Sequence, residues 1–195
     1  MVKFIGFYDY TVLLTYLSLV SAVLGITQAC CGAYTAAILC LVVSGICDAF
    51  DGTVARTKKN RTEDEKAFGI QLDSLCDVVS FGIFPAVICY FIGMKELAGL
   101  AVLLIYCLCA VIRLAFFNVL EAKRQQVEEG GNKVYRGLPV TSSAIILPVA
   151  YLLRFVLPHD SFVAVLYCVM GAMAFLFVLD FSFKKPSLKK QGAKK

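Results

Sequence analysis

The sequence predicts an all-α integral membrane protein with six transmembrane helices. The 195-residue chain is 59% hydrophobic with a mean hydropathy of +0.78. Only 17% of its residues are charged, against about 25% in an average soluble domain. Six apolar runs follow one another along the chain, with the polar residues gathered between them. A very apolar soluble bundle is the alternative, but runs this long and this frequent are typical of membrane proteins.

The six runs are expected to form the membrane helices in chain order. They cover residues 10–26, 34–49, 68–92, 97–120, 141–157 and 162–180. Most have the roughly 17 to 25 residues that a helix needs to cross a bilayer. Most of the nine cysteines lie inside these runs, where cysteine packs as a small hydrophobe, so we expect no disulfide framework. We expect one catalytic membrane domain over residues 1–183 and a basic cytosolic tail over residues 184–195.

Positive charge is distributed unevenly among the connections. Lysine and arginine gather between the second and third runs, between the fourth and fifth runs, and in the C-terminal segment KKPSLKKQGAKK. The positive-inside rule then places both termini and both long loops in the cytosol. Arg154, near the far end of the fifth run, is expected to extend to the opposite interface. The net charge of +5 comes mainly from the tail, and we expect no binding of nucleic acid.

Two pairs of aspartates flank the connection between the second and third runs. Asp48 and Asp51 fall near the cytosolic end of the second helix, and Asp73 and Asp77 in the first turns of the third. Residues three and four apart share a helix face, so each helix presents its two acids together. Because the second helix ends where the third begins, the four carboxylates are expected at one depth in the membrane.

Four neighbouring carboxylates repel one another and resist burial near lipid. Divalent cations would neutralise them, and oxygen ligands favour Mg²⁺, Mn²⁺ or Ca²⁺. Two such cations, roughly 3.5–4 Å apart, would clamp a phosphate. Two alternatives stay open. The acids could pair with Arg56, Arg113 and loop lysines, or they could mark an ion or proton pathway, although no acid continues toward the far side.

The residues of this region resemble the motif of the CDP-alcohol phosphotransferase family. The family pattern is D-x-x-D-G-x-x-A-R, a spacer, and then G-x-x-x-D-x-x-x-D. All eight fixed positions are present, as Asp48, Asp51, Gly52, Ala55, Arg56, Gly69, Asp73 and Asp77. Twelve residues separate the two halves, where many members have about eight, and the extra residues fall in a loop. The segments FGIQLDSLCDVVSFGIFPA, IRLAFFN and YRGLPVTSSA are similar to those of bacterial and archaeal phosphatidylserine synthases.

This resemblance implies the fold of that family and transfer of the phosphatidyl group of CDP-diacylglycerol to the hydroxyl of L-serine, with release of CMP. It implies two divalent cations, Mg²⁺ or Mn²⁺ with Ca²⁺ as a non-productive occupant, held by Asp48, Asp51, Asp73 and Asp77. Asp77 would also act as the general base. The residues that would surround the CDP-lipid are Gly52, Ala55, Arg56 and Gly69. The candidates for contacts with serine or phosphate are Arg113, Asn118 and Arg136.

The resemblance further implies a homodimer in the plasma membrane of a prokaryote, among membrane lipids and with a cytosolic active site. The spacing Ser21-x-x-x-Gly25 is typical of close helix contacts and agrees with a dimer. The same motif would serve another acceptor or donor, namely glycerol phosphate, inositol phosphate or an archaeal CDP-lipid. An ion or proton transporter is the alternative from a different functional class.

Overall fold

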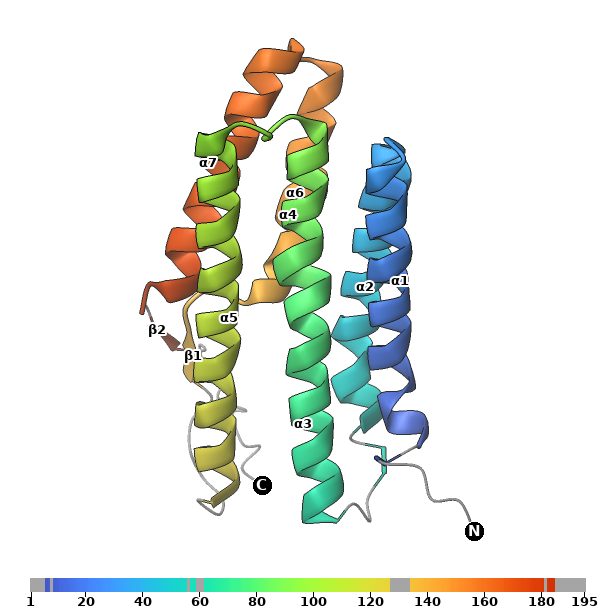
Figure 1. Ribbon diagram of the computed structural model, residues 1–195. Coiled ribbons are helices and arrows are strands. Elements are labelled where there is room, and N and C mark those ends of the chain that lie inside the picture. The colour runs from blue at the N-terminus through green and yellow to red at the C-terminus, as the bar shows by residue number, and fades with distance from the viewer. Residues whose placement is uncertain are drawn as a thin grey trace, which may run out of the picture.

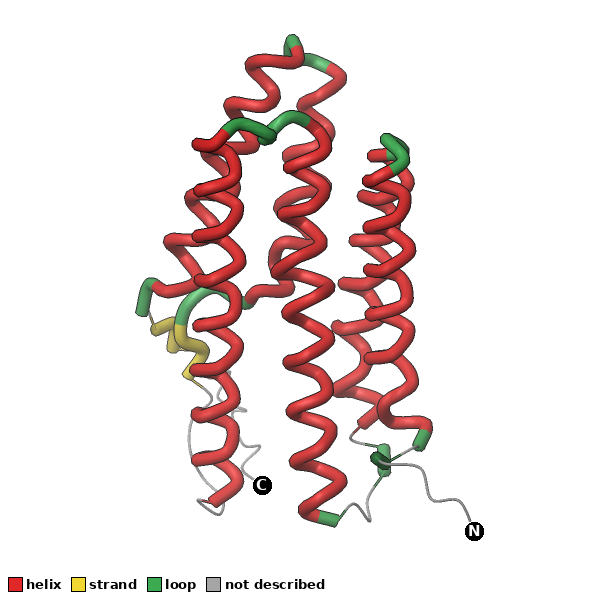
Figure 2. The backbone as a smooth tube through the Cα atoms, in the orientation of Figure 1, coloured by secondary structure: helices red, strands yellow, loops and turns green. Residues whose placement is uncertain are grey.

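The computed structural model describes residues 6–7, 9–55, 57–58, 62–126, 134–180 and 182–184. These residues form a bundle of long helices that lie side by side, and helix accounts for nearly all of the backbone (Figures 1 and 2). The α-helices are α1 Leu13–Cys30, α2 Tyr34–Ala55, α3 Glu63–Asp77, α4 Phe84–Ile92, α5 Leu97–Gln126, α6 Ser143–Leu152 and α7 His159–Val178. The shorter elements are η1 Tyr10–Val12, η2 Val78–Ile83, η3 Val140–Ser142, η4 Leu153–Phe155, β1 Val134–Arg136 and β2 Ser182–Lys184.

Five helical stretches are long and apolar enough to cross a membrane. They are Tyr10–Cys30, Tyr34–Ala55, Glu63–Ile92, Leu97–Glu121 and His159–Val178. A sixth apolar helical stretch, Val140–Phe155, is shorter and corresponds to the fifth predicted run. Large apolar side chains cover much of the outer surface, which suits contact with lipid. The prediction of an all-α membrane fold is confirmed, with one span shorter than expected.

The third span is a continuous rod made of α3, η2 and α4 (Figure 1). It begins at Glu63, within a polar segment that the sequence analysis placed in a loop. The reason is a capping box: the Thr62 amide donates to Glu65 Oε2 at 2.9 Å, and the Glu65 amide donates to Thr62 Oγ1 at 3.2 Å. The helix therefore extends past the apolar run.

Helices α1 and α2 pack closely through small and hydroxyl-bearing residues. The hydroxyls of Ser18 and Ser44 lie 2.7 Å apart, and each also donates to the other residue's carbonyl, at 3.2 and 3.1 Å. Ser21 donates to the Cys40 carbonyl at 2.9 Å, and a Cβ on Gly25 would lie 2.8 Å from the Cys40 Cβ. Ser21 and Gly25 therefore serve packing within the chain. Their spacing gives no support to a dimer interface.

Two short strands, which were not expected from the sequence, join distant parts of the chain. β1 lies between α5 and α6, β2 follows α7, and the two pair in antiparallel register from Val134↔Lys184 to Arg136↔Ser182 (Figure 2). Strand β2 includes Lys184, the first residue assigned to the basic tail. Residues 185–195 lie outside the described residues, so the division into a domain of 1–183 and a tail remains a prediction.

Candidate active site

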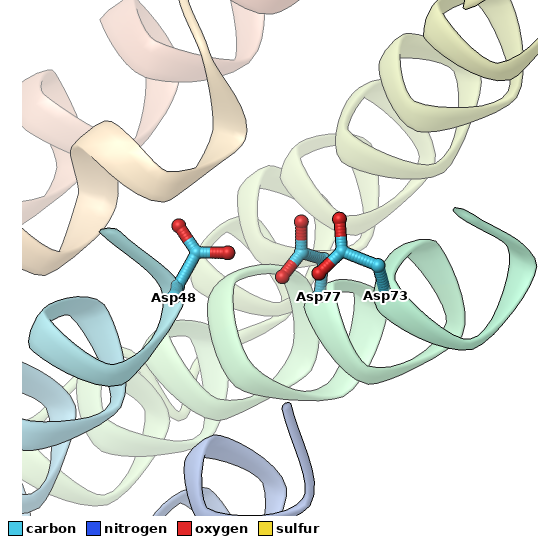
Figure 3. A group of neighbouring side chains, drawn as sticks. All are labelled: Asp48, Asp73 and Asp77. Carbon is cyan, nitrogen blue, oxygen red and sulfur yellow. The ribbon is translucent and has the colours of Figure 1, made fainter. Parts of the chain in front are cut away.

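Three carboxylates meet where the end of α2 faces α3. Figure 3 shows Asp48 on α2 directed toward Asp73 and Asp77 on α3. One oxygen from each of the three lies within 4.8 Å of the others. Asp77 is buried, and Asp48 and Asp73 are half-buried. Helical spacing places Asp73 and Asp77 on one face of α3, and the antiparallel arrangement of α2 and α3 brings Asp48 to the same depth.

Asp51 lies beside this cluster and is hydrogen-bonded by a residue of α1. Its Oδ2 accepts a hydrogen bond from Thr15 Oγ1 of α1 at 3.1 Å. Asp51 and Asp73 are electrostatic neighbours, as are Asp48 and Asp77. The four predicted metal ligands are thus neighbours, three in the tight cluster and Asp51 at its edge.

The cluster fits a divalent cation by its donors and by one unsatisfied atom. Asp73 Oδ1 is buried and has no hydrogen-bond partner among the described residues. A buried carboxylate oxygen without a partner is costly, and mutual repulsion among the acids adds to that cost. Carboxylate oxygens are the donors that Mg²⁺ and Mn²⁺ prefer, so a cation would satisfy the oxygen and neutralise the repulsion.

A cavity of about 450 Å³ opens next to the cluster. Five positions of the motif line it, namely Asp51, Gly52, Ala55, Gly69 and Asp73. Its volume is in the range of sites that take small ligands and cofactors, roughly 300–1,000 Å³. Because Gly52, Ala55 and Gly69 have short side chains or none, they leave this space open between the helices. Arg56, the remaining predicted contact for the CDP-lipid, lies outside the described residues.

Two lysines of the α2–α3 region, which the sequence analysis considered as topology signals and as ion-pair partners of the acids, also line the cavity. Lys58 and Lys66 are on its wall, together with Glu121 of α5. Lys58 Nζ bridges two acids, with Asp9 Oδ2 at 2.8 Å and Glu65 Oε1 at 3.0 Å. The hydrogen bond from Lys58, supported by one from Thr11, lowers the pKa of Asp9 to about 2. The bridge fastens the segment before α1 to the connection between α2 and α3.

The predicted acceptor residues occupy different parts of the fold. Asn118 of α5 accepts a hydrogen bond from Ser74 Oγ at 2.7 Å, so it contacts α3 one residue away from Asp73. Arg136 belongs to β1, and its side chain lies outside the described atoms. The structure therefore ties Asn118 to the helix of the acidic cluster.

Arg113 lies at the junction of α5, α7 and the chain before η3. A Cβ added to Gly137 would lie 2.9 Å from Arg113 Nη1 and 2.9 Å from the Leu179 carbonyl oxygen. Gly137 also has a φ of +68°, in the left-handed region that favours glycine. The carboxylate that acts on Arg113 is that of Asp180, at the end of α7. The alternative in which Arg113 pairs with one of the four motif acids stays open, with Asp180 as a further charged neighbour.

A π-helical segment, η2, begins directly after Asp77. Pro85 has no amide hydrogen, so it cannot donate the usual helical bond to the Phe81 carbonyl. That carbonyl instead accepts from Tyr106 Oη at 2.6 Å and from Ser143 Oγ at 3.4 Å. The two bonds hold η2 against α5 and α6 just beyond the acidic cluster. π-Helical turns of this kind are frequent at functional sites.

Comparison with known proteins identifies the family of the chain. The family described as CDP-alcohol phosphatidyltransferase matches residues 10–180. The chain belongs to this family. The matched range includes all six apolar stretches and every residue of the acidic cluster. Family membership favours the phosphotransferase interpretation of the acids over an ion or proton pathway.

Several curated relatives of this family member have names that specify an acceptor. The "CDP-diacylglycerol--serine O-phosphatidyltransferase" of Saccharomyces cerevisiae is 40% identical over 116 residues, which cover 58% of this chain and 41% of the relative. The "Archaetidylserine synthase" of Methanothermobacter thermautotrophicus is 34% identical over 144 residues, 73% of this chain and 58% of the relative. The chain spans about half the length of these relatives. No solved structure matches it significantly.

Sequence reasoning missed the parts of this family member's site that are formed by tertiary contact. Thr15 of α1 and Glu121 of α5 approach the acids only because their helices pack against α2 and α3. Lys58 and Lys66 belong to a charged segment that was considered for topology and for ion pairs with the acids, but not as part of a cavity wall. The one local signal available was the Thr62-x-x-Glu65 capping pattern, which places the first turn of α3 at the cavity.

Proposed function

We propose that this chain is a metal-dependent phosphatidylserine synthase, which transfers the phosphatidyl group of CDP-diacylglycerol to the hydroxyl of L-serine and releases CMP. The observation that carries the proposal is the cluster of Asp48, Asp73 and Asp77 beside a cavity lined by the other small and acidic motif residues. The names of the yeast and archaeal relatives support serine as the acceptor. They do not distinguish a diacylglycerol donor from an archaeal one, so both donors belong in the test.

Different residues of the chain have different roles in this reaction. Asp48, Asp51, Asp73 and Asp77 would hold divalent cations, Mg²⁺ or Mn²⁺. When bound, these cations would supply positive charge to the pyrophosphate and to the departing CMP. Gly52, Ala55 and Gly69 leave room for the cytidine nucleotide in the cavity. Lys58 and Lys66 on its wall offer ammonium groups to phosphate oxygens.

Asp77 is assigned the proton transfer. It is the most buried of the three clustered acids, at 7% exposure, and it lies at the inner end of the motif. Its carboxylate would accept the proton of the serine hydroxyl as that oxygen attacks the phosphorus. Asn118, held by Ser74, and Arg113, beside Gly137, are positioned on the α5 side, where they would bind the amino acid.

The position of the site suits two substrates of different solubility. Helix α2 ends and α3 begins at one end of the bundle (Figure 1), and Asp48 and Asp51 lie in the last two turns of α2. The connection between these two helices is basic. We assign this end to the cytosol by the positive-inside rule, in the plasma membrane of a prokaryote. A lipid would then reach the cavity from the bilayer and serine from the cytosol. We also propose a homodimer, which light scattering of the detergent-solubilised protein would test.

The function is tested by supplying the purified protein with CDP-diacylglycerol, or an archaeal CDP-lipid, and one acceptor at a time. CMP release should require Mg²⁺ or Mn²⁺, stop with EDTA, and depend on L-serine. Asp77→Asn should lose turnover, and Asp160→Asn, at the other end of the bundle, should behave as the wild type. CMP release with glycerol phosphate or inositol phosphate but not with serine would contradict the proposed acceptor.

A further inference from the structure

A second pocket is lined by residues from the start of α2, the end of α4 and the connection between α6 and α7. These segments lie at the end of the bundle opposite to the α2–α3 connection (Figure 1). The volume of this pocket is about 230 Å³. We call it the distal pocket. Polar groups on its wall come from Tyr34, Tyr151, Arg154 and His159. Its apolar wall consists of Ile92, Leu157 and Phe162. None of these residues belongs to the family motif or to the proposed reaction.

Arg154 is held in place at this pocket by three neighbours. Its Nη1 donates to Thr35 Oγ1 at 3.3 Å. Its guanidinium lies 4.8 Å from the centre of the Tyr151 ring and 5.2 Å from that of Phe155. Tyr151 Oη lies 3.2 Å from the same Thr35 hydroxyl, so the stacked ring is fixed in turn. An arginine that merely extended to the interface would need none of these contacts.

The guanidinium is fixed without a carboxylate partner. Within the part of the chain that the structure describes, no acid lies within 4.0 Å of Arg154. Glu96 and Asp160 are the acids at this end, and both are exposed. A guanidinium has five N–H donors, and the contact with Thr35 uses one nitrogen. Donors therefore remain for an anion that the chain itself does not provide.

The surroundings of Arg154 match a phospholipid headgroup. Guanidinium groups bind phosphate through paired hydrogen bonds. The neighbouring side chains Leu152, Phe155 and Val156 are apolar and exposed, as expected where acyl chains lie against the protein. Tyrosine and histidine at the pocket rim suit the boundary between lipid and water.

We propose that the distal pocket binds the phosphate of an anionic phospholipid headgroup, with Arg154 as the main ligand and His159 as a second donor. The site would be occupied by a lipid of the opposite leaflet from the reaction. The proposal does not depend on the proposed function, because it uses no residue of the acidic cluster.

The test is native mass spectrometry of the full chain in detergent, titrated with phosphatidylglycerol. Arg154→Gln keeps an amide that can donate to Thr35 but removes the charge, and Lys95→Ala removes an exposed charge at the same end. We expect Arg154→Gln to lose one lipid adduct with about tenfold weaker binding, as for the loss of one charge-assisted contact. Lys95→Ala should match the wild type. Equal adducts in Arg154→Gln and wild type would overturn the proposal.

A second arm distinguishes a lipid from a free phosphate. Soluble glycerol phosphate has the same phosphate without acyl chains, and we expect it neither to bind detectably nor to displace the lipid. If it occupied the site and left the lipid adducts unchanged, the lipid assignment would be wrong. Thermal unfolding of each variant is measured in parallel, and Arg154→Lys, which keeps the charge, should recover part of the lipid binding if Arg154→Gln has lost it.

Discussion

Replacing Asp73 with asparagine should separate the stability of the acidic cluster from its function. The three clustered carboxylates have oxygens within 4.8 Å of one another. Two unit charges at that distance repel by about 3.5 kcal/mol at an effective dielectric constant of about 20. Asp73→Asn removes the charge and adds an amide that can donate to its neighbours. Without metal, we expect the variant to be more stable than the wild type by about 3.5 kcal/mol per charge pair, less wherever an acid is protonated.

Divalent metal should reverse this order. A cation at about 100 times its dissociation constant stabilises the protein that binds it by about 2.7 kcal/mol. The wild type should therefore gain stability with Mg²⁺, whereas Asp73→Asn, with one donor fewer and less negative charge, should gain little. The same variant should lose CMP release. Stability in the metal-free state and function are thus expected to change in opposite directions.

Thermal unfolding can be followed with a thiol-reactive fluorophore, because Cys47, Cys76 and Cys89 are buried and become reactive on unfolding. The wild type, Asp73→Asn and Asp64→Asn are compared in EDTA and in MgCl₂. Asp64 is exposed on the first turn of α3, so its variant controls for loss of one charge on the same helix. The reasoning is refuted if Asp73→Asn unfolds at a lower temperature than the wild type in EDTA, or if it keeps the full response to Mg²⁺.

Two further predictions concern the connections around the site. Gly137→Ala should lower the free energy of unfolding by about 1–3 kcal/mol, because a Cβ at a φ of +68° would lie 2.9 Å from Arg113 Nη1. Gly171→Ala, where nothing lies within 4 Å, should be neutral or stabilising, and equal losses in thermal unfolding would contradict this view. Lys58 lowers the pKa of Asp9 to about 2. The contribution of the ionised Asp9 to the free energy of unfolding should therefore be complete above about pH 4 and disappear toward pH 2. Unfolding of the wild type and Asp9→Asn from pH 2 to 6 measures this difference, and a constant difference would exclude the ion pair as its source.

The acidic cluster follows from local rules. Asp73 and Asp77 share a face of α3 by helical spacing, and hydropathy places the end of α2 next to the start of α3. The position of Asp48 next to them can therefore be predicted without knowing how the side chains pack. The apolar runs likewise predict the membrane helices, because lipid requires long stretches of apolar helix whatever their neighbours are.

Other features depend on contacts between residues far apart in the sequence. The pairing of β1 with β2 joins Tyr135 to Phe183, and no local pattern specifies such a partner. The Phe81 carbonyl is satisfied by Tyr106 on another helix, so the π-helical segment is stabilised by tertiary structure. Gly25 matched a pattern for association between chains, yet a Cβ there would meet Phe84 and Cys40 of the same chain. Small residues identify a close helix contact without identifying the partner helix.

The close pairing of α1 with α2 has a consequence for how the protein is made. The reciprocal bonds between Ser18 and Ser44 need only these two helices, so the hairpin can associate in the membrane before α3 has been synthesised. That early hairpin already contains Asp48 and Asp51, together with Thr15. Asp73 and Asp77 arrive with the next helix, so three of the carboxylates come together only when α3 docks. Metal affinity would thus be acquired late in biogenesis, and a nascent chain that has not inserted α3 would have no site at which to begin chemistry.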